Sequence, residues 1–565
     1  MLYIQDNTVK AVTKTLNATI KDGLITALTS NANNKRYIDI PDISKYSGLA
    51  LVYPNNRSVN LSNGLQSEIK CLKVNDYCVE FRIHSWHGDG IISISEDIET
   101  GDLIIEPSAF SGQRGVRSVK WAVPGIAESL ELIAPIYQGI KMDMTDPLIN
   151  GGRYMWPMFW EAGFAVLQDN QANSENKGGF WIYCKDGGYK YKTLNIGVKG
   201  DPHALAFETD TYGPIDDNTS AGGLAWRINI FEGDWHMPAS YYKNWLYENY
   251  NLAAQKKLRK DWIYDIKAAI SWFPSDINAL ELLENHVNPS KVLLHVPNWR
   301  KYKYDENYPD YTPSDEAKAF FEYGQNLGFH MMPHGNSVDM DPTHSVYQLI
   351  RDYEYIDIES KSRHGWGWNE NGYMGVPSSN LNLTKNRHNK VMIKVHPANK
   401  MWQSVLRDEL SSAVNILNAD SIFTDVTLCS GNLHNCLVDS TTPSEGMNLL
   451  IKNIGSINNG IPVGGEGLNE ITFQGLSFAQ AHLFNSHQSS CEGLEHTGGI
   501  DLNNFLFGDL CRTFGYSKLS GKTEDERLRI KIHDDHGAIP TVTCGVNDLL
   551  NPNETMLSIF KKTKE

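Results

Sequence analysis

The stretch that decides the fold is SIFTDVTL (421–428), followed by SEGMNLLIKNIGSI (444–457) and IPVGGEG (461–467). A short apolar run, a segment with helical spacing of its apolar residues and a second apolar run follow one another. Two strands joined by a crossover helix lie parallel in one sheet. The three segments therefore predict a β-α-β unit.

The same alternation of strand-like and helix-like runs continues over residues 290–565. The strand-like runs are KVLLHVPNW (291–299), FHMMPHGN (329–336), VMIKVHPAN (391–399), SIFTDVTL, IPVGGEG, NNFLFGDL (503–510) and GAIPTVTCG (537–545). A helix is expected over 314–328, with Ser314 as its N-cap and Gly328 as its C-terminal stop. Repeated alternation predicts a closed (β/α)8 barrel. An open doubly wound sheet is the alternative, but no Gly-rich phosphate loop follows the first run.

The N-terminal part of the chain has a different pattern. Residues 1–234 contain short β-like runs broken by turn clusters, for example in 71–86 and 178–198, which predict a large antiparallel β-sandwich. Residues 235–289 have helical spacing and few turn formers, so we expect a helical connector there. The predicted order is sandwich, connector and barrel.

Composition excludes several classes of protein. The net charge of -16 arises from 67 acidic and 51 basic residues without a dense Lys/Arg cluster, so nucleic acid is not an expected partner. The opening sequence lacks a basic segment leading into an apolar run, and no stretch of about 18 apolar residues occurs, so no membrane partner is expected. We expect a cytoplasmic protein, or a secreted or periplasmic one whose signal peptide has been removed. The pattern does not indicate an oligomeric state.

Functional groups of a (β/α)8 barrel lie at the C-terminal ends of its strands. The polar or aromatic residues that end the strand-like runs are Trp299, His334, Asn336, His396, Asn399, Asp425, Glu466 and Asp509. Cleavage of a glycosidic bond requires one carboxylic acid and one carboxylate, and consecutive strands would place Asp425 beside Glu466. We therefore expect Asp425 and Glu466 to be catalytic. Trp299, His334, Asn336, His396 and Asp509 are the expected substrate-binding residues.

The two carboxylates are expected to play different roles. Asp425 precedes Val426 and Thr427, whose backbone and hydroxyl donors would keep it ionised as a nucleophile. Glu466 follows two glycines, where a raised pKa suits a general acid and base. Glu470 is an alternative to Glu466, and an isolated Asp at a strand end can instead form a turn or cap a helix.

Metal chemistry has little support in the sequence. Histidines are scattered through the barrel half at His295, His330, His334, His396, His434, His482, His487 and His496, without an HExxH pattern. The eight cysteines lack zinc spacing, and no GxSxG nucleophile motif occurs. No metal or other cofactor is expected. The 14 tryptophans and 26 tyrosines suit stacking on sugars, so a carbohydrate is the expected partner.

Several segments resemble barrel glycosidases related to endo-α-N-acetylgalactosaminidases. HVPNWRKYKYDENYPDYTP (295–313) and GFHMMPHGN (328–336) resemble the first two strands of these enzymes. FTDVT (423–427) resembles their nucleophile motif, and GGEGLNE (464–470) resembles the segment with their acid/base glutamate. YMWPMF (154–159), GGFWIYCKD (178–186) and FEGDWHMPASYYKNWL (231–246) resemble their sandwich and linker segments.

This resemblance implies a β-sandwich joined to a barrel, an α-linked substrate and retention through a double displacement at Asp425 and Glu466. The characterised mucin-cleaving members are much larger, so small oligosaccharides or glycoconjugate fragments are the expected substrates. Two alternatives remain: a non-catalytic carbohydrate-binding protein on a glycosidase scaffold, and another sugar-active barrel enzyme such as a transglycosidase or a metal-dependent deacetylase.

Overall fold

The computed structural model describes residues 1–62, 67–170, 177–198, 200–369, 372–374, 390–481, 498–515, 518–522 and 526–565. The chain forms two compact units, Met1–Asn249 and Tyr250–Glu565. Within these described ranges, no helix is both long enough and apolar enough to cross a bilayer.

The first unit consists of antiparallel sheets followed by helix α1 (His236–Asn249). A five-stranded sheet contains β1 (Leu2–Gln5), β2 (Thr8–Val12), β3 (Leu16–Lys21), β4 (Leu24–Ser30) and β5 (Arg36–Asp39). A ten-stranded sheet has the order β14 (Ile140–Asp143), β13 (Leu130–Ala134), β16 (Phe164–Asp169), β17 (Gly178–Tyr183), β21 (Trp226–Glu232), β11 (Leu103–Phe110), β10 (Gly88–Glu96), β9 (Cys78–Ser85) and β8 (Ser67–Asn75), with β20 (Ser220–Gly222) paired to β11. A six-stranded sheet has the order β15 (Arg153–Met155), β18 (Lys192–Val198), β19 (Asp201–Asp210), β12 (Ser118–Val123), β6 (Leu49–Tyr53) and β7 (Arg57–Asn60).

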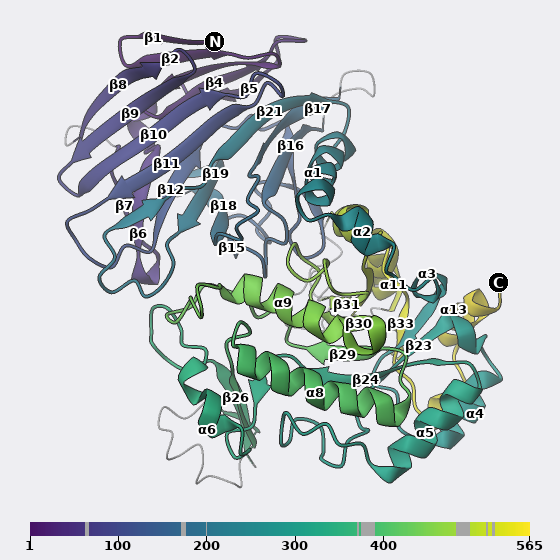
Figure 1. Ribbon diagram of the computed structural model, residues 1–565. Helices are drawn as coiled ribbons and strands as arrows, with labels where there is room; N and C mark the ends of the chain where they lie inside the picture. Colours follow the sequence, from purple (N-terminus) through teal and green to yellow (C-terminus); the bar gives the residue numbers. More distant parts are fainter. Residues whose placement is uncertain are drawn as a thin grey trace. The chain divides into compact units, whose positions relative to one another are not determined.

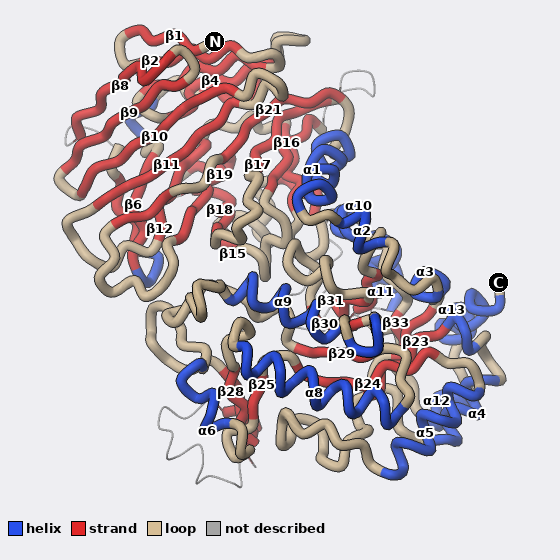
Figure 2. The backbone as a smooth tube through the Cα atoms, in the orientation of Figure 1, coloured by secondary structure: helices blue, strands red, loops and turns tan. Residues whose placement is uncertain are grey.

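The two larger sheets of this unit pack face to face (Figures 1 and 2). Phe207 on β19 lies 4.7 Å from Trp226 on β21, measured between ring centroids, and both rings are fully buried. Trp160 stacks on Trp226 as well, at 6.1 Å. Aromatic rings from the two facing sheets form a common core, as in a β-sandwich. The predicted sandwich is confirmed.

The second unit contains an eight-stranded parallel barrel. Its strands, in order along the chain, are β22 (Ala268–Ile270), β23 (Val292–Val296), β24 (His330–Asn336), β29 (Ile422–Asp425), β30 (Val463–Glu466), β31 (Phe478–Ala481), β32 (Arg512–Gly515) and β33 (Thr541–Val542). Strand β33 pairs with β22, and the Ile539 amide just before β33 donates to the Thr513 carbonyl at 2.7 Å. The sheet therefore closes on itself, which confirms the predicted (β/α)8 barrel.

Helices lie on the outside of the barrel strands (Figure 2). The helices of this unit are α2 (Leu252–Lys256), α3 (Trp262–Asp265), α4 (Ile277–Glu284), α5 (Asp315–Asn326), α6 (Tyr347–Ile350), α8 (Lys400–Leu417), α9 (Pro443–Gly455), α10 (Leu502–Phe507), α11 (Glu526–Asp535), α12 (Val546–Leu550) and α13 (Glu554–Lys564). Helix α5 packs between α4 and α8, and α8 packs on α9. Helix α5 begins as predicted, because Ser314 Oγ accepts from the Ala317 amide at 3.1 Å.

Three predictions about individual barrel strands are wrong. The first barrel strand is β22, which lies inside the predicted connector 235–289, so the barrel begins before residue 290. The run 391–399 contributes β28 (Lys390–Lys394) to a separate antiparallel sheet with β25 (Asp339–Met340), β26 (Gly365–Asn369) and β27 (Gly372–Met374). The run 503–510 forms helix α10 instead of a strand.

Side chains that point into the barrel form two layers. The lower layer is apolar and fully buried, and its members include Ala269, Leu293, Met332, Phe423 and Phe478. Successive side chains on a strand point to opposite faces, so a residue two positions further along also points inward. The upper layer is therefore formed by Ser271, His295, His334, Asp425, Glu466 and Gln480, which we call the polar layer.

Candidate active site

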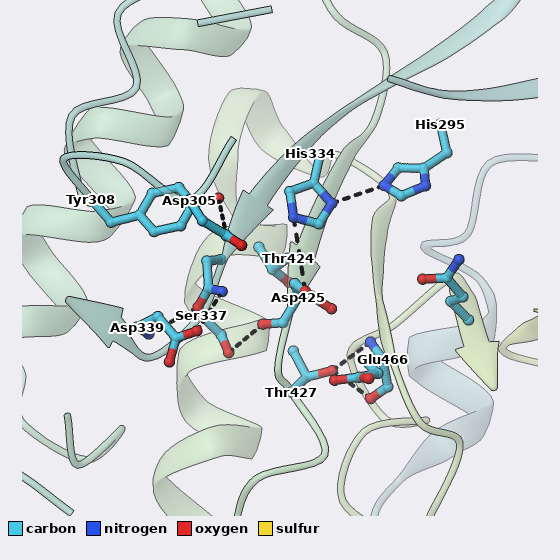
Figure 3. A network of polar contacts seen from close by, with 12 residues as sticks. His295, Asp305, Tyr308, His334, Ser337, Asp339, Thr424, Asp425, Thr427 and Glu466 are labelled. Carbon is cyan, nitrogen blue, oxygen red and sulfur yellow. Dashed lines mark hydrogen bonds and ion pairs between the residues drawn. The ribbon is translucent and has the colours of Figure 1, made fainter. Parts of the chain in front are cut away.

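The polar layer places the two predicted catalytic carboxylates on adjacent strands (Figure 3). Thr424 on β29 is in register with Gly465 on β30, and Asp425 and Glu466 are the next residues on the two strands. Neighbouring strands lie about 4.8 Å apart, so the two side chains rise from neighbouring points at the carboxyl end of the barrel. The predicted adjacency is confirmed.

The backbone around Asp425 is held rigidly. Ser337 donates to the Asp425 carbonyl from its amide at 3.0 Å and from its hydroxyl at 2.7 Å. Trp402 donates from its indole nitrogen to the Ser337 carbonyl at 2.8 Å. The next residue, Val426, has a left-handed backbone with φ 64°, which is a rare and strained conformation for a β-branched side chain. Such strain costs about 1–3 kcal/mol and is concentrated at functional sites.

The Asp425 carboxylate lies in a setting that disfavours its charge. Its side chain is 16% exposed, and its Oδ1 is buried without a hydrogen-bond partner among the described residues. Burial raises the pKa of Asp425 well above its ordinary value, and the charges of Glu466, Asp305 and Asp339 raise it further. The Val426 amide acts in the opposite direction. The carboxylate is therefore held among other acids.

Thr427 positions the second carboxylate instead of the first. Its hydroxyl donates to the Glu466 carbonyl at 2.7 Å and accepts from the Glu466 amide at 2.8 Å. The expectation that Thr427 donates to Asp425 is therefore wrong. Gly464, two residues before Glu466, is closely packed. A Cβ at this position would lie 2.5 Å from the Met332 sulfur. Glu466 ends β30, whereas Glu470 lies in the following loop with its side chain buried.

A loop after β23 brings further acidic and aromatic groups to the site. Arg300 donates to three carbonyls of this loop at 2.9 Å, and its guanidinium lies 4.3 Å from the centre of the Tyr308 ring. The Tyr308 hydroxyl donates to Asp305 Oδ1 at 3.3 Å. Burial raises the pKa of the Tyr304 hydroxyl strongly, followed by the charges of Asp425 and Asp305. The loop therefore places Asp305 and Tyr304 near Asp425.

Asp339 is a third carboxylate near the pair, and the sequence did not point to it. Its Oδ1 accepts from Lys394 Nζ at 2.9 Å, and its Oδ2 accepts from the Trp366 indole at 2.9 Å. Asn336 donates to Asp339 Oδ2 at 3.1 Å and accepts the amides of the following turn. Burial lowers the pKa of Lys394, but the charges of Asp339, Cys429 and Glu466 outweigh it and raise that pKa overall.

Removing the ammonium of Lys394 leaves Asp339 as a buried charge. We expect Lys394→Ala to lower the free energy of unfolding by about 3–5 kcal/mol, because breaking one side of a buried ion pair is that costly. Chemical denaturation measures the change. Lys394→Met in an Asp339→Asn background is the matched control and should cost far less. Equal losses of unfolding free energy in the wild-type and Asp339→Asn backgrounds would show that Lys394 and Asp339 are not coupled.

The remaining predicted substrate-binding residues have other roles. Trp299 is 1% exposed and donates to the His334 carbonyl at 2.8 Å, so it supports β24 and offers no face to a sugar. Asn336 is equally buried and positions Asp339. The His334 ring faces the carboxylate, with Nε2 3.9 Å from Asp425 Oδ2. Trp299 and Asn336 are therefore covered by other side chains, whereas His334 lies close to Asp425.

Two predicted residues lie apart from the carboxylate pair. His396 is fully buried, with Nε2 donating to the Cys436 carbonyl at 3.1 Å and Nδ1 accepting from the Ala398 amide at 3.1 Å. Both ring nitrogens are thus used by the backbone. Asp509 lies in the turn between α10 and β32, at the amino end of the strand, where its carbonyl accepts from the Tyr264 hydroxyl at 2.7 Å. The prediction that Asp509 ends a strand is wrong.

Trp272 is an aromatic residue of the site that the sequence analysis missed. It lies two residues after the end of β22, is partly exposed and has a left-handed backbone with φ 59°. Its ring lies 4.9 Å from the Tyr304 ring and 6.3 Å from the His334 ring, measured between centroids. A tryptophan shortly after the apolar run 268–270 could have indicated this residue. The helical spacing of the surrounding residues led to the prediction of a connector instead of a strand.

A partly exposed aromatic ring beside the carboxylates is suited to stack on a sugar. We expect Trp272→Ala to lower kcat/KM about 10- to 100-fold, because burying an aromatic ring contributes about 1.5–3 kcal/mol and each 1.4 kcal/mol is tenfold. Steady-state kinetics measure the loss. Trp272→Phe should recover most of it, whereas Trp299→Phe should act mainly through stability. Unchanged kcat/KM in Trp272→Ala would exclude the stacking role.

Metal-ligand geometry does not occur in the part of the chain that the structure describes, where no group of three or more His, Cys, Asp or Glu side chains could hold an ion. His482, His487 and His496 of the sequence analysis lie outside the described residues.

The fold is similar to that of solved barrel glycosidases. The ligand-free alpha-N-acetylgalactosaminidase NagBb from Bifidobacterium bifidum is similar in structure with a TM-score of 0.66 at 12% identity, over 100% of this chain and 93% of that chain. Its complex with GalNAc matches with a TM-score of 0.63 at 12% identity, over 91% of this chain and 84% of that one. This similarity concerns the fold, and it confirms the expected resemblance at that level.

Comparison at the level of sequence is less informative. A family model described as a domain of unknown function (DUF6259) matches residues 224–447. No curated protein matches the chain.

Proposed function

We propose that the protein is a retaining glycoside hydrolase that cleaves α-linked glycosides, with Asp425 as nucleophile and Glu466 as general acid and base. The observation that carries the proposal is the pair of carboxylates at the carboxyl ends of adjacent barrel strands, both pointing inward. Retaining enzymes separate their carboxyl groups by about 5–5.5 Å, which adjacent strands can provide.

The proposed reaction has two steps. Asp425 attacks the anomeric carbon while Glu466 gives its proton to the leaving oxygen, and a covalent glycosyl ester forms on Asp425. Glu466 then takes a proton from water as the water attacks the same carbon, and the ester bond breaks. The Asp425 side chain is 16% exposed, and this partial exposure supports its proposed role as a nucleophile that a sugar can reach.

The surrounding groups are suited to a neutral sugar. Trp272 is proposed to stack on the ring, and Asp305 is proposed to accept hydrogen bonds from sugar hydroxyls. Lys394 would donate to a hydroxyl while it neutralises Asp339. The substrate is proposed to be a small oligosaccharide or a glycoconjugate fragment.

A screen with aryl α-glycosides of N-acetylgalactosamine, galactose and glucose tests the proposal. N-acetylgalactosamine comes first, because NagBb is an alpha-N-acetylgalactosaminidase with a solved GalNAc complex. Proton NMR of the released sugar should show the α-anomer before mutarotation. Release of the β-anomer would indicate inversion. Absence of turnover, together with measurable sugar binding, would favour a carbohydrate-binding protein on the same scaffold.

The clustered carboxylates around Asp425 predict where the acid limb of the pH profile of kcat/KM should lie. Asp425 must be ionised to attack, and its pKa is raised by burial and then by Glu466, Asp305 and Asp339. We therefore expect kcat/KM to fall as the pH drops through a pKa well above the ordinary value for Asp. Asp305→Asn removes one neighbouring charge and should move this limb to lower pH. A limb that stays in place would exclude coupling between the two residues.

A further inference from the structure

A chain of polar contacts crosses the barrel within the polar layer and ends at Asp425. Gln480 donates from its amide to Ser271 Oγ at 3.1 Å, and Ser271 Oγ lies 3.4 Å from His295 Nδ1. His295 Nε2 then lies 2.9 Å from His334 Nδ1. His334 Nε2 faces Asp425 Oδ2 at 3.9 Å (Figure 3). All five residues belong to the polar layer.

Both imidazole rings of this chain are neutral. They are almost fully buried, and burial lowers the pKa of His295 to about 3 and that of His334 well below its ordinary value. A neutral imidazole has one donor nitrogen and one acceptor nitrogen. Where two neutral rings share a hydrogen bond, one must donate and the other must accept. The contacts therefore run in a single direction along the chain.

The two ends of the chain define that direction. At one end the Gln480 amide donates to the Ser271 hydroxyl, whose own proton is then free for His295 Nδ1. His295 must accordingly carry its proton on Nε2 and donate it to His334 Nδ1. The proton of His334 is then on Nε2, toward Asp425. The opposite direction would place a nitrogen lone pair against a carboxylate oxygen.

The carboxylates of Glu466, Asp305 and Asp339 oppose the charge of Asp425. The titratable groups that face Asp425 are Glu466 on β30, Asp339 on β25, His334 on β24, Cys429 after β29, and Tyr304, Asp305 and Tyr308 in the loop after β23. Burial lowers the pKa of both imidazoles most strongly, and smaller contributions come from Lys518 on His295 and from His295 and Arg300 on His334. His334 Nε2 faces Asp425 Oδ2, and this nitrogen has no hydrogen-bond partner in the described part of the chain.

We propose that His295 and His334 form a neutral relay that holds a hydrogen-bond donor against Asp425, so that the carboxylate stays ionised. The proton of His334 Nε2 would engage Oδ2 once the distance shortens by about 1 Å. His295 and His334 are then positioning residues, since neither touches substrate. The inference rests on the proposed function only for its effect on turnover.

The first test reads the tautomer of His334 directly and requires no substrate. In protein labelled with ¹⁵N-histidine, NMR should show His334 protonated on Nε2, with the signal assigned by its loss in His334→Gln. His295→Leu leaves His334 Nδ1 without a donor, so the fraction of His334 rings protonated on Nε2 should fall. His295→Gln keeps an amide donor near the position of Nε2 and should retain the native tautomer. A wild-type ring protonated on Nδ1 would overturn the relay.

The second test uses the pH profile of kcat/KM. His295→Leu should move the acid limb upward by about one pH unit, because a donor to the charged form of Asp425 is lost. In His295→Gln the acid limb should lie close to its wild-type position. Identical limbs in the two variants would overturn the proposal. If no glycoside is turned over, the proposed function fails, while the tautomer measurement still decides the relay. If His295→Leu does not fold, the wild-type tautomer and the His295→Gln profile decide it.

Discussion

Asp425→Ala should lower kcat by at least about 10⁴-fold, since removing a nucleophile leaves only the contributions of binding and orientation. Azide in the small space left by the carboxylate should restore turnover and yield a β-glycosyl azide, because it attacks from the side on which Asp425 acted. An α-glycosyl azide from this variant would assign the nucleophile to another residue. Stopped assays with NMR of the product measure both rate and configuration.

Replacing Asp425 should lower activity but should not lower folding stability. A carboxyl group whose pKa is raised in the folded protein lowers stability at every pH above its unfolded value, because its charge is less favourable when folded. Asp425→Asn should therefore unfold at the same temperature as the wild-type protein or above it at neutral pH. Asp509→Asn is the matched control, since Asp509 lies at the amino end of β32, and it should leave kcat unchanged.

Glu466→Gln should lower kcat/KM about 10²- to 10⁴-fold for substrates whose leaving group needs a proton. Aryl glycosides with acidic leaving groups need little protonation, so their first step should be nearly unaffected. Rates for a series of aryl substrates, plotted against the pKa of the leaving phenol, should become much steeper in this variant. Azide acting on Glu466→Ala should give an α-glycosyl azide, opposite to the product from Asp425→Ala.

Glu470→Gln provides the comparison for Glu466. Glu470 is buried in the loop after β30, so its substitution should alter stability and leave the slope against leaving-group pKa as in the wild-type protein. A steep slope in Glu470→Gln and a wild-type slope in Glu466→Gln would exchange the two assignments.

The sequence predicted the two catalytic candidates through two errors that cancelled. Strand β22 was missed, because its three residues Ala268–Ile270 follow a long stretch of helical spacing. The run 391–399 was counted as a barrel strand, because a short apolar run fits any sheet until its partner is known. Asp425 and Glu466 therefore kept their places at the ends of the fourth and fifth strands.

The contacts of the remaining side chains could not be predicted from strand-end position alone. Trp299 and Asn336 do follow the expected strands, but whether a polar or aromatic group faces substrate depends on what covers it. Trp299 is covered by Tyr311, whose ring stacks on it at 6.2 Å. Asp339 was missed for the opposite reason, since it lies in a two-residue strand of a small sheet and not in the barrel.

The closure of the barrel has a consequence for its motions. Strand β33 is two residues long, and the first strand is attached to it through few bonds, among them Ala269 N to the Pro540 carbonyl at 3.0 Å and Ser271 N to the Val542 carbonyl at 2.9 Å. Local opening begins where the fewest bonds must break. Fluctuations at this seam would reach Ser271 and Trp272 before they reach β29, so the ring proposed to stack on the sugar would move while the proposed nucleophile Asp425 stays in place.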